Sequence, residues 1–67
     1  MTQVDYEDET GRPLLTRREQ HVPRVGDRIA VTTDEQASRT VHGRVSGVHW
    51  TVRREYTVVT VAVESDE

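Results

Sequence analysis

The amino-acid sequence predicts an all-β fold: one small barrel of five strands in a single domain that spans residues 1–67. Short runs in which apolar and polar residues alternate are typical of half-buried strands. Glycine or proline punctuates several of these runs, which favours turns between strands over long helices. A chain of 67 residues has little material with which to cover open sheet edges, and closure into a barrel removes those edges.

The first two strands are predicted to form a hairpin. In residues 2–8, Val4 and Tyr6 alternate with polar neighbours, which indicates a half-buried strand. A turn at Gly11 follows, because glycine adopts positive φ without steric cost. The second strand is expected over residues 14–21, although two adjacent leucines followed by five polar residues make its pattern poor. A short helix is the alternative there, but no capping pattern precedes a long helical stripe.

Residues 22–27 form the clearest turn of the sequence. Pro23 fixes its own φ and extends the residue before it, and Gly26 permits a tight reversal. A third strand is predicted over residues 28–33. A polar loop over residues 34–40, with room for one helical turn, then leads to the fourth strand.

The fourth strand, over residues 41–53, is predicted to contain a β-bulge. Its apolar residues follow one phase up to Val45 and the opposite phase from Val48 onward. A bulge at Ser46-Gly47 produces such a slip, bends the strand and returns the apolar side chains to the core face. Gly47 is interpreted as the residue that permits the switch, and a positive φ there would make Gly47→Val strongly destabilising.

A loop at residues 53–55 and a fifth strand over residues 56–64 complete the predicted fold. The loop contains no Gly or Asn, so a tight primed turn is not expected. The fifth strand has valines in one phase and Tyr56 and Val58 in the other, which predicts partial cover on both faces or an exposed patch. Residues 65–67 are expected to fray.

The predicted core contains the apolar residues that alternate onto one face of these strands. Trp50 is interpreted as a core anchor, with a binding role at the surface as the alternative. The expected core consists of Val4, Tyr6, Ile29, Val31, Val45, Val48, Trp50, Val59 and Val61. So small a domain is expected to be stable by only about 5 kcal/mol.

Composition and charge order restrict the functional classes. The chain has no Cys, which excludes disulfides and thiolate metal sites and fits a reducing cytoplasm. Its apolar runs are at most three residues long and its start is polar, so neither a membrane span nor a signal peptide is expected. All nine basic residues are arginines within residues 12–54, between two acidic segments, and the net charge is −3.

Three segments carry a resemblance to a known family. Residues 25–31 (VGDRIAV) place a Gly-Asp turn before an alternating strand, residues 41–48 (VHGRVSGV) space two glycines, and residues 58–63 (VVTVAV) form a valine-rich strand. In these features residues 22–64 resemble SH3-like barrels of the KOW and Tudor kind. The loop at 34–40 departs from the KOW pattern, which has Gly and Lys there, and this argues against RNA or ribosome binding.

The chain is also similar to small barrel proteins of actinobacterial phages, which share the VPRVGD turn. That resemblance implies a fold and an origin, and it transfers no functional residue. An arginine-only, valine-rich composition agrees with a GC-rich genome of this kind.

The histidines and serines do not predict an active site. His21, His42 and His49 are dispersed over two strands, and without Cys all three would have to converge to hold a metal. Ser46 and His49 are near in sequence, but no nucleophile elbow or orienting acid accompanies them. We therefore expect no catalytic residue, no metal, no cofactor and no enzymatic activity.

The arginines are the stronger candidates for a binding surface, because guanidinium groups suit bidentate contacts with phosphate or carboxylate. The candidate binding residues are Arg17, Arg18, Arg44, Arg53, Arg54, Tyr56 and Val58. The main hypothesis is a small cytoplasmic protein-binding module, phage- or prophage-encoded, that engages a host or virion protein. The alternative is a nucleic-acid-binding barrel with an Arg-rich face. Self-association is a further option, and no membrane partner is expected. If the arginines only pair with the acidic ends of the chain, they have no binding function.

Overall fold

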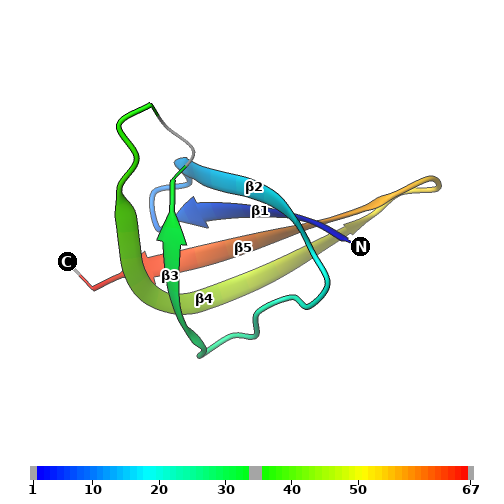
Figure 1. The fold of residues 1–67 in the computed structure, drawn as a ribbon. Coiled ribbons are helices and arrows are strands. Elements are labelled where there is room, and N and C mark those ends of the chain that lie inside the picture. The colour runs from blue at the N-terminus through cyan, green and yellow to red at the C-terminus, as the bar shows by residue number, and fades with distance from the viewer. Residues whose placement is uncertain (1, 34–35, 67) are drawn as a thin grey trace.

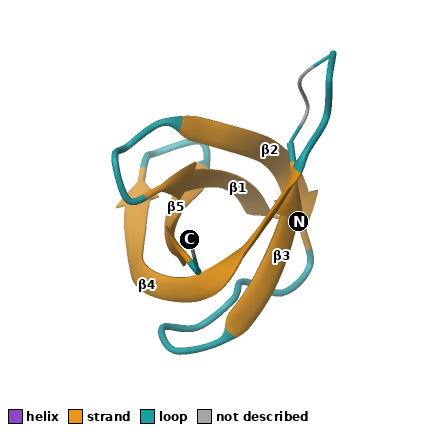
Figure 2. Ribbon diagram, turned by 90° about the vertical axis from the view of Figure 1, so that its left-hand side faces the viewer, coloured by secondary structure: helices purple, strands orange, loops and turns teal. Residues whose placement is uncertain are grey.

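The computed structural model describes residues 2–33 and 36–66 and confirms the all-β prediction. The five strands are β1 (Thr2–Asp8), β2 (Pro13–Glu19), β3 (Arg28–Thr32), β4 (Thr40–Val52) and β5 (Thr57–Ser65). They form one curled sheet, a half-barrel that is consistent with a small SH3-like barrel (Figure 1, Figure 2). None of the described residues is helical, so no helix in this part of the chain is long and apolar enough to cross a bilayer.

The predicted strands match the observed ones apart from their ends. The second strand is shifted, since it begins at Pro13 and ends at Glu19. Part of the predicted loop at 34–40, namely residues 34 and 35, lies outside the described residues. The remainder of that loop is non-helical up to Arg39, and β4 begins at Thr40.

The first and last strands lie side by side in the middle of the sheet. The strand order is β2-β1-β5-β4-β3, and β1 pairs with β5 in parallel while the other neighbours are antiparallel. Val4 lies opposite Val59 and Tyr6 lies opposite Val61. The two end strands, β2 and β3, curl toward each other on either side of a seam (Figure 2).

Two predicted glycine turns are confirmed by their backbone geometry. Gly11 has φ 84° and Gly26 has φ 95°, values that favour glycine. The Gly26 amide donates to the Val45 carbonyl at 2.8 Å, and the Val45 amide donates to the Asp27 carbonyl at 2.9 Å. The second turn therefore fastens the start of β3 to the middle of β4.

The core lies on the concave face of the sheet. Its buried residues are Val4, Tyr6, Leu14, Val31, Val41, Val45, Val59, Val61 and Val63. Ile29 and Val48, predicted as core, are partly buried and pack against this cluster. The prediction for Trp50 was wrong, because 53% of this residue is exposed.

The predicted bulge in β4 is present. Val45 lies opposite Val63 and Gly47 lies opposite Ala62, which leaves Ser46 as the extra residue. The Ser46 hydroxyl donates to the Ala62 carbonyl at 3.3 Å. The expected role of Gly47 was wrong: its φ is not positive, and a Cβ added there would meet no atom within 4 Å.

A second register shift explains the poor pattern of β2. Tyr6 lies opposite Leu15 and Glu7 lies opposite Pro13, so Leu14 has no partner on β1. Leu14 is buried, and Leu15 packs against the core from the neighbouring position. The bulge therefore brings two adjacent leucines to the core, which simple alternation would place on opposite faces.

Gly43 is the glycine that packing requires. It lies opposite Ser65 at the end of β5, and it belongs to β4, the strand that Figure 1 shows curving around the core. A Cβ at this position would overlap the Glu64 carbonyl oxygen, a backbone atom. The absence of a side chain thus allows the two strands to approach closely.

Candidate functional site

The β4–β5 hairpin extends beyond the rest of the sheet (Figure 1). β3 pairs with β4 only as far as Arg44, and β1 meets β5 from Val58 onward. Residues 53–56 connect the two strands, and the Arg53 amide donates to the Tyr56 carbonyl at 2.8 Å. No described non-glycine residue has positive φ, so this turn is not of the primed kind, as predicted. We call residues 48–58 the hairpin arm.

The hairpin arm exposes large apolar side chains on both of its faces. Trp50 is 53% exposed, Val52 is 74% exposed and Tyr56 is 60% exposed. Trp50 lies opposite the buried Val59, which places its side chain on the concave face, and Val52 shares that face two residues further along. Tyr56 belongs to the opposite face. Apolar residues concentrated in this way are typical of interaction sites.

A pocket of about 340 Å³ lies beside the Trp50 side chain. The turn that precedes β3 forms its other wall, and the lining residues are Val22, Pro23, Arg24, Val25, Val48 and Trp50. Val25 is 64% exposed and extends the apolar surface of the arm. None of these six residues was among the predicted binding residues. The sequence contained two signals for this surface. Residues 22–25 (VPRV) form an apolar turn, and a binding role at the surface was the alternative interpretation of Trp50.

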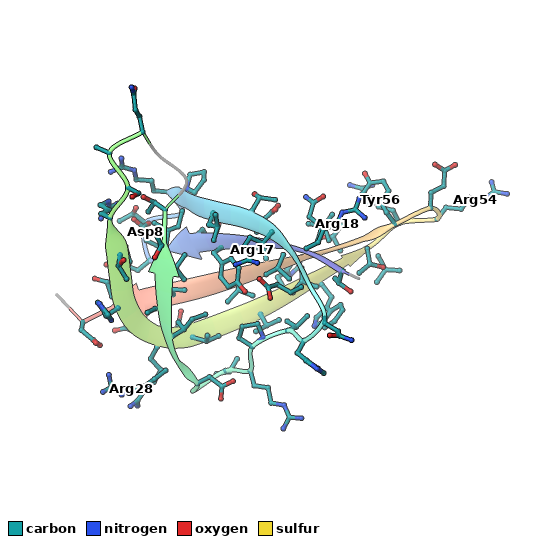
Figure 3. All side chains as sticks on the ribbon, viewed as in Figure 1. Asp8, Arg17, Arg18, Arg28, Arg54 and Tyr56 are labelled. Carbon is teal, nitrogen blue, oxygen red and sulfur yellow. The ribbon has the colours of Figure 1, made fainter. Side chains whose placement is uncertain are left out.

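The opposite face of the arm gathers three of the predicted binding residues. Arg18 from β2, Tyr56 from the loop and Val58 from β5 line one depression of about 740 Å³. Gln3, Asp5, Glu55 and Thr57 complete it. Figure 3 shows Arg18 and Tyr56 near each other. Arg53 and Arg54, also predicted, lie on the loop at the tip of the arm, where Figure 3 shows Arg54 pointing outward.

The remaining predicted residues, Arg17 and Arg44, lie elsewhere. Arg17 neighbours Arg18 in β2 and therefore points to the opposite face, where its Nε is 3.5 Å from Glu19 Oε1. Arg44 on β4 lies opposite Glu64 on β5. The seven residues thus do not share one face.

At the end of the sheet away from the arm, acidic residues lie next to arginines. β1 and β5 are neighbours, but the acidic end of β5 does not form an uninterrupted negative surface with β1. Glu64 lies across from Arg44, and Asp66 Oδ2 is 3.4 Å from Arg28 Nη1. These exposed pairs contribute little stability, about 0–1 kcal/mol each.

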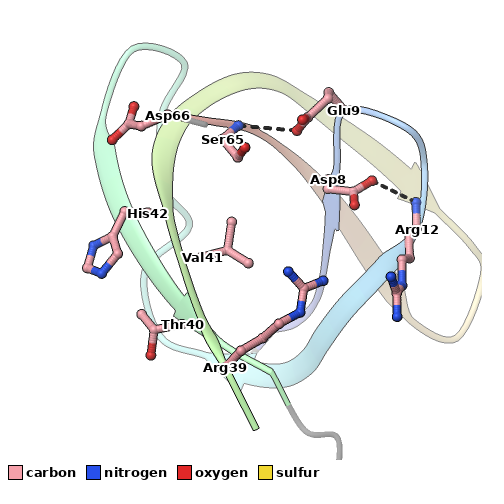
Figure 4. A pocket seen from close by; sticks show the side chains of 9 residues that line it. All are labelled: Asp8, Glu9, Arg12, Arg39, Thr40, Val41, His42, Ser65 and Asp66. Atoms are coloured by element: carbon pink, nitrogen blue, oxygen red, sulfur yellow. Dashed lines mark hydrogen bonds between the residues drawn. The ribbon is translucent and has the colours of Figure 1, made fainter.

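A second pocket, of about 460 Å³, lies at the far end of the half-barrel from the arm (Figure 4). Its acidic residues are engaged in holding the chain together. Asp8 Oδ1 accepts hydrogen bonds from the Thr10 hydroxyl at 2.6 Å and from the Arg12 amide at 3.0 Å. Glu9 Oε2 accepts a hydrogen bond from the Ser65 amide at 3.2 Å. The Asp8 contacts brace the first turn and the Glu9 contact ties that turn to β5, so we assign this pocket a structural role.

Among the described residues, Asp8 and Tyr6 have perturbed pKa values, and both belong to the scaffold outside the arm. The hydrogen bond from the Thr10 hydroxyl is the main cause that lowers the pKa of Asp8 below its ordinary value. Burial raises the pKa of Tyr6, and the nearby carboxylate of Glu19 raises it further, against the opposing effect of Arg17. Neither group lines the surfaces of the arm.

The described residues contain no group of three or more His, Cys, Asp or Glu that could hold a metal ion. His21, His42 and His49 are all exposed. The Ser46 hydroxyl is bonded to a backbone carbonyl on β5. The apolar surfaces of the arm are therefore the stronger candidates for function.

Comparisons of this chain with protein-family models, with curated proteins and with solved structures found no match.

Proposed function

We propose that this chain is a small, non-enzymatic protein-binding module that contacts its partner through the hairpin arm. The observation that carries this proposal is the concentration of exposed large apolar residues there: Trp50, Val52 and Tyr56, with Val25 beside them. Trp, Tyr and Arg are the side chains most enriched among the energetically dominant residues of protein interfaces. The arm supplies all three types, because Arg53 and Arg54 occupy its tip.

Composition supports a proposal about the source and the partner. An arginine-only, valine-rich chain fits a phage or prophage of a host with a GC-rich genome. The proposed partner is then a host or virion protein. The lack of Cys supports a site of action in the reducing cytoplasm.

Nucleic-acid binding is the second candidate, favoured by the convergence of Arg18 and Tyr56 in one depression next to Arg53 and Arg54. Arginines contact phosphates, and aromatic rings stack on bases. Asp5 and Glu55 line the same depression and repel phosphate. This acidic lining makes a protein partner the better fit.

Affinity capture with matched variants tests the proposed function. The baits are the wild type, Trp50→Ala and His42→Ala, where His42 is exposed on β4 outside the arm and serves as the control. We expect one protein, identified by mass, to be retained by the wild type and by His42→Ala and to be lost with Trp50→Ala. Equal retention by all three baits would contradict a role for the arm.

Retention on duplex DNA at low and at moderate salt separates the two candidates. Phosphate contacts release counterions, so nucleic-acid binding weakens steeply as salt rises. Strong retention at low salt that disappears in an Arg53→Ala/Arg54→Ala variant would favour the nucleic-acid reading. We expect no such retention.

A further inference from the structure

One edge of β4 is left uncovered along the hairpin arm. β3 pairs with residues 40–44 of β4, and the turn before β3 pairs with Val45. From Val48 to Val52, every β4 partner in the described chain belongs to β5. The edge that faces away from β5 is therefore free over these five residues, and we call it the free edge of β4.

The backbone groups of alternate residues point to the free edge. In a strand, the amide and carbonyl of one residue point to the same side, and those of the next residue point to the other side. The Arg53 amide bonds across the hairpin to Tyr56, so Arg53 faces β5. Counting back along the strand, the amides and carbonyls of Val48, Trp50 and Val52 face the free edge.

The side chains of these same three residues lie on the concave face of the arm. Val48 packs partly against the core, whereas Trp50 and Val52 are exposed. The pocket between Trp50 and the turn at residues 22–25 lies alongside. Unpaired backbone groups beside a side-chain pocket are the combination that recognises an extended peptide by strand addition.

The free edge of β4 lacks the features that normally prevent edge-to-edge pairing. Proteins protect open edges with charged residues or with proline. β2 contains Pro13 and a run of charged residues, and β3 begins with Arg28. Residues 48–52 are VHWTV, with neither a proline nor an acidic or basic residue of fixed charge.

Charges at both ends of the free edge indicate the chemistry of its occupant. Arg24 lines the pocket next to Trp50, and Arg53 and Arg54 follow the edge directly. Glu55 is the one acidic residue of the tip loop. This excess of positive charge complements acidic side chains on a partner.

We propose that the free edge of β4 binds an extended segment of a protein partner as an added strand. The segment places an apolar side chain in the pocket beside Trp50 and acidic side chains near Arg24 and Arg53. The edge from Val48 to Val52 is roughly 16 Å long at about 3.3 Å per residue, so it accommodates about five residues of the partner. This inference rests on the proposed function, because it specifies how the arm engages its partner.

Proline substitution tests the backbone contacts without removing the arm. Proline lacks an amide hydrogen and is tolerated where that group faces solvent at an edge. Val52→Pro removes one outward donor, and Val52→Ala is the matched control that keeps it. Trp50→Ala tests the pocket. Circular dichroism of each variant establishes that the sheet is retained.

The probe is a library of random peptides of roughly ten residues, selected on the immobilised wild-type protein. We expect the selected peptides to alternate apolar residues and to be acidic. Val52→Pro should weaken their binding at least about tenfold in a fluorescence anisotropy titration, while Val52→Ala changes it by less than about threefold. Amides of Val48, Trp50 and Val52 should become protected from hydrogen exchange in the complex.

The outcomes separate this inference from the proposed function. Peptides that bind Val52→Pro as tightly as the wild type but lose affinity for Trp50→Ala would overturn strand addition and leave the arm as a side-chain surface. A failure to enrich any peptide would overturn the inference. A wild type that is dimeric by light scattering, with Val52→Pro monomeric, would assign the edge to a second copy of this chain and would also overturn it.

Discussion

Alanine at Gly43 tests the close approach of β4 and β5. The added Cβ would overlap the Glu64 carbonyl oxygen and crowd the Glu64 carbonyl carbon, and neither backbone atom can rotate away. Overpacking of a well-packed site costs about 1–3 kcal/mol, and a clash that moves backbone belongs at the upper end of this range. One kcal/mol shifts the Tm of so small a domain by about 4–8 °C, so Gly43→Ala should lower Tm by roughly 12–24 °C.

Gly47→Ala is the matched control in the same strand. A Cβ at Gly47 meets no atom within 4 Å and the backbone φ is not positive, so alanine fits without strain. The loss of glycine flexibility in the unfolded chain should leave stability unchanged or raise it by up to about 1 kcal/mol. Thermal unfolding followed by circular dichroism measures both variants. An unchanged Tm for Gly43→Ala, or equal losses for the two variants, would refute the reasoning.

Three further outcomes are expected. Trp50→Ala should lower the free energy of unfolding by about 1.5–2.5 kcal/mol in urea denaturation, roughly half the cost at a fully buried tryptophan, because Trp50 is half exposed. Val59→Ala at a fully buried site should cost about 2 kcal/mol. The pKa of the Asp8 carboxyl, measured by NMR, should lie below 3.8, and Thr10→Ala should raise it. The stability that this carboxylate contributes is complete above pH 3.8 and is lost as pH falls through the lowered pKa. An identical loss of stability at acid pH in Thr10→Ala would count against the role of the hydrogen bond. The Tyr6 phenol should ionise above pH 10.0 in an absorbance titration, with its contribution to stability complete below pH 10.0 and lost as pH rises through the raised pKa, and Tyr6→Phe should remove that step.

The strand pattern could be predicted from the sequence because alternation depends on local geometry. Val4 and Tyr6 face the core as their spacing predicts, and the phase slip between Val45 and Val48 corresponds to a real bulge. Leu14 shows the limit of this reasoning: a bulge on β2 depends on its register against β1, and register is a tertiary property.

Trp50 shows why a correct face does not establish burial. Its phase places it on the concave side with Val59, as predicted. Whether that side is covered depends on how far the neighbouring strands extend, and β3 stops pairing at Arg44. The same limit applies to the candidate site: Arg18 lies opposite Gln3 on β1, and Gln3 lies opposite Val58 on β5. This register brings Arg18 and Val58 to one surface beside Tyr56, and residue order does not reveal it.

The parallel pairing of β1 with β5 has a consequence for synthesis of the protein. The centre of the sheet joins the first strand to the last, so Val4 and Tyr6 meet Val59 and Val61 only after the ribosome has made β5. Contacts between residues so distant in the chain form slowly, because the loop between them must first close. Until then the nascent chain exposes apolar residues of its strands, and the centre of the sheet can form only after β5 has been translated.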